Sequence, residues 1–216
     1  NAFINMKKKV GWKSDTTENR NIRGIYAEML RSNGGTTEEQ QLDWERKKGL
    51  IEQTIEGLAN SSNKDDNKAS ELLQKVYNKT LKDANNISEL EANISKLEFG
   101  KFNIDSVKFW IEQHDKYADD FIEQGNIYNN KNLEKELNYT GRKYRPITKD
   151  AQKKQDDTLF DEVYRSTEIS YKESGSKTKT VKNKFLPKGL VLDLDFDKVQ
   201  AKMLYDNLYD LKTAEG

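Results

Sequence analysis

The sequence predicts a mainly α protein: a helical bundle organised on an antiparallel, coiled-coil-like hairpin, with a small C-terminal antiparallel β-meander and a closing helix. Apolar residues between positions 36 and 97 recur at alternating steps of four and three, which places them along one seam of a helix. The polar run at 60–67 separates two such segments, as the turn of a helical hairpin would. After residue 168 the apolar period changes from helical to alternating, which indicates strands.

Composition narrows the function classes. The 216 residues include 37 basic and 37 acidic side chains, so no bulk charge favours nucleic acid or an anionic membrane. The absence of cysteine excludes disulfides and thiolate metal sites, and a single histidine excludes the common zinc sites and histidine-based triads. Hydrophobic residues make up 34%, as do charged residues, which suits elongated helices with narrow buried faces. We predict no cofactor.

Targeting features are also absent from the sequence. No run approaches the roughly 18 apolar residues of a membrane helix, and the first residues lack the order of a secretion signal. We therefore expect a soluble chain with no membrane partner. The sequence does not indicate its cellular location. Because the sequence does not begin with methionine, we expect a processed product or an excerpt of a longer polypeptide. Abundant Lys, Asn, Ile and Tyr beside two prolines suggest an AT-rich source, such as a low-GC bacterium or its phage.

The N-terminal third is predicted to contain an arm and two helix starts. Residues 1–14 have apolar side chains without a sustained helical period, so they are interpreted as an arm. Asp15 and Glu18 have the spacing of a capping box and precede residues that fall on one helical face. Thr36 and Glu39 form a second capping box, which starts the first arm of the hairpin.

The second arm of the hairpin, starting near 65 or 66, has two competing interpretations. Ser88 and Glu91 form a capping box that favours a break and a new start, whereas the apolar repeat runs straight through and favours one helix. We predict one long helix with a weak point at 83–86. The seam of the first arm is Trp44, Lys48, Ile51, Ile55 and Leu58, and that of the second is Ala69, Leu73, Val76, Thr80, Asp83, Ile87, Leu90, Ile94 and Leu97.

The remaining chain is predicted to complete the bundle and to add a β-containing part. A helix at 105–124 has a wide apolar face, so it packs onto the hairpin and gives a bundle over 15–138. The segment 139–216 is predicted to form a small α+β subdomain. It contains a β-hairpin at 169–185, an alternating strand at 190–196 and a last helix at 198–212.

The preferred hypothesis is a non-enzymatic structural or interaction protein, a helical scaffold within a larger assembly such as a phage virion or a bacterial surface complex. The hairpin would bury one side and present its remaining apolar positions to a protein partner or to a second copy. Those positions are Leu42, Leu72, Tyr77 and Leu81.

An alternative hypothesis is a nucleic-acid-binding accessory module. Basic side chains with an interleaved aromatic could follow a phosphate backbone. The competing interpretation is that lysines protect an exposed sheet edge from aggregation. The residues concerned are Lys177, Lys179, Lys182 and Lys184 in the β-hairpin and Arg142, Lys143 and Arg145 in a basic loop.

The least favoured alternative is a fragment of a metal-dependent enzyme. Asp193, Asp195 and Asp197 would project from one face of a strand, about 6.5 Å apart, and could hold Mg²⁺ or Ca²⁺. The competing interpretation is a solvated strand face, with Asp197 capping the next helix. His114 lies on the apolar seam of its helix and is interpreted as a hydrogen-bonded core residue, since no orienting partner accompanies it.

Overall fold

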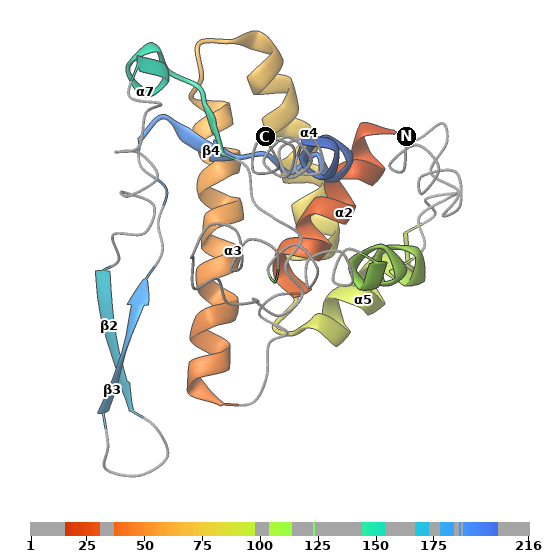
Figure 1. Ribbon diagram of the computed structural model, residues 1–216, viewed down its shortest axis with the longest axis vertical. Coiled ribbons are helices and arrows are strands. Elements are labelled where there is room, and N and C mark those ends of the chain that lie inside the picture. Colours follow the sequence, from red (N-terminus) through yellow and green to blue (C-terminus); the bar gives the residue numbers. More distant parts are fainter. Residues whose placement is uncertain are drawn as a thin grey trace. The chain divides into compact units, whose positions relative to one another are not determined.

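Figure 1 shows the computed structural model of the chain, and it confirms the mainly helical fold with a small antiparallel sheet towards the C-terminus. The structure describes residues 16–30, 37–97, 104–113, 123, 144–153, 167–172, 178–183, 186 and 188–202. The described elements are α2 (Thr17–Leu30), α3 (Glu38–Ala59), α4 (Lys64–Thr80), α5 (Ile87–Ser95), β1 (Tyr144–Pro146), α7 (Lys149–Lys153), β2 (Thr167–Lys172), β3 (Thr178–Asn183) and β4 (Leu190–Leu192). The predicted arm at 1–14 lies outside the described residues.

The chain divides into two compact units, each built from segments that are far apart in the sequence. The first unit comprises 1–27, 99–142 and 194–216, and the second comprises 28–98 and 143–193. The predicted domain boundaries at 14 and 138 stay a prediction. Within the second unit, β4, which belongs to the predicted C-terminal subdomain, packs against α3 of the hairpin.

In the first unit, α2 is capped by Thr16, whose Oγ1 accepts a hydrogen bond from Asn19 N at 3.2 Å. The predicted cap, Asp15, lies outside the described residues. The apolar face of α2 is buried as its spacing predicts. Gly24 permits a close approach of the chain, because a Cβ there would lie 2.1 Å from the carbonyl oxygen of Leu194.

The helix at 104–113 supplies the aromatic core of the same unit. Trp110 is 1% exposed, and its Nε1 donates to Gln200 Oε1 at 3.2 Å. The rings of Trp110 and Phe196 pack in an edge-to-face arrangement, with their centroids 6.0 Å apart. Residue 123 is also helical, but the rest of the predicted 105–124 helix, including His114, lies outside the described residues.

In the second unit, α3 and α4 pack side by side and are joined by residues 60–63 (Figure 1). The cap of α3 is Thr37, which forms a capping box with Gln40, one residue later than the predicted Thr36–Glu39 pair. The predicted seam of α3 is buried, including the stem of Lys48. The helical hairpin is therefore present, and coiled-coil packing within it stays a prediction.

The prediction of one long second arm is wrong. The first helix of this arm, α4, ends at Thr80, and α5 begins at Ile87. The new start is capped by Asn86, whose Oδ1 accepts from Glu89 N at 3.0 Å, rather than by Ser88. Backbone carbonyls freed by the break are bonded to side chains of α3 and α5, which is why the interruption is tolerated. These bonds join Trp44 Nε1 to Ala84 O (2.9 Å), Lys48 Nζ to Lys82 O (2.7 Å) and Asn93 Nδ2 to Thr80 O (3.0 Å).

In the part of the chain that the structure describes, the β-structure consists of two separate two-stranded antiparallel sheets rather than one meander. The predicted β-hairpin is confirmed as β2 and β3, with position 169 opposite position 181. The other sheet pairs β1 with β4, and β4 stops at Leu192, short of the predicted end at 196. All three residues of β4 are buried, because the strand lies against α3, where Leu192 N donates to Thr54 Oγ1 at 3.0 Å. Gly57 allows this approach, since a Cβ there would lie 2.9 Å from Val191 Cγ1.

Candidate functional site

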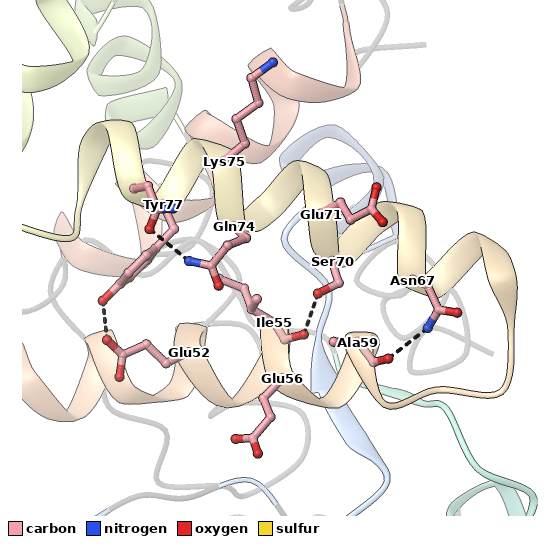
Figure 2. Close-up of a pocket in the computed structure, with 11 residues that line it drawn as sticks. Glu52, Ile55, Glu56, Ala59, Asn67, Ser70, Glu71, Gln74, Lys75 and Tyr77 are labelled. Atoms are coloured by element: carbon pink, nitrogen blue, oxygen red, sulfur yellow. Dashed lines mark hydrogen bonds between the residues drawn. The ribbon is translucent and has the colours of Figure 1, made fainter.

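The candidate site is an open groove on the α3–α4 hairpin, with a volume of about 770 Å³. Figure 2 shows α3 along one side and α4 along the other. The α3 wall consists of Glu52, Ile55, Glu56 and Ala59, at helical spacing. The α4 wall is mostly polar: Asn67, Ser70, Glu71, Gln74, Lys75, Tyr77 and Asn78. Because both walls are helices of one hairpin, the groove lies wholly within the second unit.

The floor of the groove is closed by contacts between the two helices. Ser70 Oγ donates to Ile55 O at 2.7 Å, and these residues are only 4% and 5% exposed. At one end, Asn67 Nδ2 lies 3.0 Å from Ala59 O. The exposed surface of the groove is nevertheless mostly apolar, and polar side chains stand along both walls.

Tyr77 crosses the groove from α4 to α3. Figure 2 shows its ring directed at Glu52, and the Tyr77 hydroxyl donates to Glu52 Oε1. Burial raises the pKa of Tyr77 well above its usual range, and so do the hydrogen bond to Glu52 and the negative charges of Glu52, Glu45 and Asp83. The tyrosine is therefore neutral at physiological pH, and its hydroxyl lies in a locally negative environment.

The walls of the groove are acidic overall. Three glutamates and one lysine give the lining a formal charge of −2. Glu52, Glu56 and Glu71 are exposed, and the side chain of Lys75 extends away from α3 in Figure 2. On α4, Gln74 Nε2 donates to Asn78 Oδ1 at 3.0 Å, which adds a neutral polar pair to the rim. This arrangement suits the binding of cationic or hydrogen-bonding groups.

The four predicted partner-binding residues differ in how far they are buried. Leu42 and Leu72 are half-buried. Tyr77 is 5% exposed and lines the groove, whereas Leu81 is 0% exposed. Leu81 is a core residue, which corrects the expectation that it is left over for a partner. The reason is the break after α4, where Leu81 forms the C-cap and turns inward.

Only three of the predicted basic residues fall in the described part of the chain, so the nucleic-acid-binding patch stays a prediction. Arg145 Nη2 donates to Asp66 Oδ1 at 2.7 Å and so belongs to the turn end of the hairpin. Alternate positions of a strand share a face. Positions 179 and 182 of β3 are three apart, so these two positions belong to opposite faces of the strand. Lys177, Lys184, Arg142 and Lys143 lie outside the described residues.

The three aspartates predicted as a metal site do not lie along a strand face, because β4 ends before them. Asp195 begins the helix at 196–202, accepting from Lys198 N at 3.2 Å, and its other oxygen lies 2.9 Å from Arg20 Nε. Asp197, predicted as the cap, instead lies 3.2 Å from Arg23 Nη2. Within the described ranges, no group of three or more acidic or histidine side chains could hold a metal ion.

Comparison of the chain with protein-family models, with curated proteins and with solved structures found no match. Among the helices that the structure describes, none is long and apolar enough to cross a bilayer. The groove itself is the feature that sequence reasoning missed. The sequence indicates this groove only through the acidic positions 45, 52 and 56, which lie on one side of the apolar seam of α3.

Proposed function

We propose that this protein is a non-enzymatic interaction protein that holds a segment of a partner protein in the α3–α4 groove, as one component of a larger assembly. The observation that carries the proposal is the groove of about 770 Å³, whose walls carry exposed polar and acidic side chains over a closed floor. Docking of an amphipathic segment into an apolar groove is a recurrent mode of peptide recognition, and the exposed lining of this groove is mostly apolar.

The construction of the hairpin supports this proposal because the groove is preformed. Both helices have capped N-termini, at Thr37 and Asn63. They are joined across the floor by the bond from Ser70 Oγ to Ile55 O. A surface fixed in this way loses little conformational entropy when a partner binds, which favours binding.

The polar side chains of the walls also indicate the strength of the contact. Exposed charges favour rapid, salt-sensitive association more than very tight affinity. The half-buried Leu42 and Leu72 remain candidates for additional partner contacts. A virion or bacterial surface complex remains the proposed setting, supported by composition alone.

The experiment is a selection of binding peptides from a random library displayed on phage, with the full chain as the bait. The blocking variant is Gln74→Trp, which places an indole on the exposed α4 wall of the groove. The matched control is Gln152→Trp, the same substitution at an exposed position of α7. We expect enriched peptides to bind the wild type and the control equally and to bind Gln74→Trp at least tenfold more weakly. Peptides that bind all three proteins alike, or no enrichment, would overturn the proposal.

A further inference from the structure

Asp43 and Asp66 of the same unit have cationic partners, whereas the glutamates of the groove, like Glu38 and Glu39 outside it, form no ion pair within the described residues. Asp66 pairs with Arg145 at 2.7 Å, and Asp43 pairs with Lys47 at 3.0 Å. Over the residues that the structure describes, no ion pair joins Glu56 or Glu71 to a basic side chain. These carboxylates keep their charge exposed at the rim.

Glu52 is also uncompensated, although it has a hydrogen-bond partner. That partner is the hydroxyl of Tyr77, a neutral donor. A neutral donor orients the carboxylate and leaves its full negative charge in place. Glu52 is therefore held in a fixed position over the groove and remains available to a cation.

The acidic surface continues beyond the groove along α3. Positions 45, 52 and 56 lie within roughly 40° of one another around the helix and span about 16 Å along its axis. Glu45, Glu52 and Glu56 are all exposed. The acidic stripe, defined as these three residues, is long enough for several basic side chains of one bound segment.

The spacing of the carboxylates suits a peptide. Residues four apart on a helix have Cβ atoms about 6 Å apart, which describes Glu52 and Glu56. Basic residues one turn apart on a helix, or two apart on an extended chain, have a matching spacing. A guanidinium or ammonium group can form charge-assisted hydrogen bonds with each carboxylate.

The remaining chemistry of the groove favours a basic segment over other occupants. The exposed surface of its lining is mostly apolar, so the stems of lysine and arginine side chains can lie along it while their charged groups reach the carboxylates. Nucleic acid and anionic lipid would be repelled by the lining charge of −2. The chain as a whole is neutral, so attraction of a cation must come from this local surface.

We propose that the occupant of the α3–α4 groove is a lysine- or arginine-rich segment of a partner protein, held by Glu52, Glu56 and Glu71. This inference rests on the proposed function and specifies the chemistry of the partner. Binding is expected to weaken as salt rises, because exposed charges are screened over about 10 Å at 0.1 M ionic strength.

The test measures binding of three fluorescent synthetic peptides of equal length to the full chain by polarisation. Their variable positions carry lysine, glutamine or glutamate. The groove variant is Glu52→Gln/Glu56→Gln/Glu71→Gln. The control has the same change of charge at three exposed glutamates outside the groove: Glu38→Gln, Glu39→Gln and Glu112→Gln. A further variant, Lys75→Glu, makes the lining more negative.

We expect the lysine peptide to bind the wild type and the control alike, and to bind the groove variant at least tenfold more weakly. Lys75→Glu should tighten its binding several-fold, so the inference is testable even if the groove variant folds poorly. Equal binding to groove and control variants, or no response to Lys75→Glu, overturns the inference. If library selection yields groove-dependent peptides that are neutral or acidic, the inference falls and the proposed function stands. If selection yields no groove-dependent peptide, the proposed function falls, and the inference falls with it.

Discussion

The two ends of α4 are determined in different ways. The helix begins after a polar loop, but it ends in the middle of an apolar repeat that continues in the sequence. The first end is organised by nearby residues. Asn63 Oδ1 caps the helix by accepting from Asp65 N at 2.9 Å. Asn67 Nδ2 lies 3.1, 3.0 and 3.0 Å from the carbonyl oxygens of Leu58, Ala59 and Ser61, which end α3. Each of these four contacts joins residues within ten positions of one another.

The other end of α4 depends on residues that are distant in the sequence. The carbonyl of Ala84 is bonded to Trp44, 40 residues away, and that of Lys82 to Lys48, 34 residues away. Both donors come from the apolar seam of α3. The comparison teaches that one helix can begin through local capping and end through tertiary contacts, and that only the first kind of end is visible in a sequence.

The largest expected effect is at Trp44, which is 0% exposed. Trp44→Ala removes a buried aromatic side chain and the donor to Ala84 O, so we expect unfolding to become easier by about 3–5 kcal/mol. Trp44→Phe keeps most of the apolar contact and leaves the carbonyl unsatisfied, which costs about 1–3 kcal/mol. Urea unfolding measures both values.

Hydrogen exchange shows where the effect of Trp44→Phe lies. We expect faster exchange of the amides at 84–94 and unchanged exchange at 61–67. Equal acceleration at both ends of α4 would mean that the break is not stabilised separately from the turn.

The second effect is at Asn67, the local counterpart. Asn67→Ala removes contacts to three carbonyl groups, and we expect a loss of about 1–2 kcal/mol because water replaces part of them. Asn67→Asp has nearly the same shape but cannot donate and brings a negative charge to the C-terminus of α3, so it should be at least as harmful. Exchange should accelerate at the turn only. A variant Asn67→Asp as stable as the wild type would show that these contacts contribute nothing.

The fold was predictable where its determinants are local. The seam of α3, the apolar face of α2 and the pairing of β2 with β3 follow from periodicity, and the structure has them. The break at 81–86 and the short β4 were not predictable in the same way, because they depend on Trp44 and Thr54, which act across 40 and 138 residues. A continuous repeat specifies which face is buried, but it does not specify that the backbone is continuous.

The candidate site follows the same rule. The acidic positions of α3 are readable from the sequence, but their pairing with α4 depends on the register of two helices. The aspartates at 195 and 197 resembled a ligand set because the sequence does not reveal Arg20 and Arg23, which neutralise them from α2. Charged residues are therefore assigned to a site or to a structural pair only when the tertiary partner is known.

The third effect is at Asn86, the cap of α5. Asn86→Ala removes the acceptor of Glu89 N and should cost about 1 kcal/mol. Asn86→Asp keeps an acceptor at this position and should be nearly neutral. If Trp44 and Lys48 hold the break in place, Asn86→Ala should accelerate exchange in α5 without extending α4, which NMR chemical shifts of 81–86 would report. Helical shifts across 81–86 would show that the cap, rather than the tertiary contacts, interrupts the arm.

The smallest effect is at the turn end, where Arg145 reaches Asp66. Burial raises the pKa of Asp66, but the hydrogen bonds from Ser61 and Arg145 and the charge of Arg145 lower it more, so the net pKa lies below its usual value of 3.8. A carboxyl whose pKa is lower in the folded state than in the unfolded state stabilises the protein at any pH above its unfolded-state pKa. This contribution is lost as the pH falls through its folded-state pKa. Arg145→Gln should therefore cost about 0.2–1 kcal/mol at neutral pH, the usual contribution of a partly exposed pair. The difference from the wild type should shrink as the pH falls below 3.8.

Urea unfolding at neutral and acidic pH measures this difference in the free energy of unfolding. A difference that does not change with pH would mean that Arg145 stabilises the turn by packing rather than by its charge.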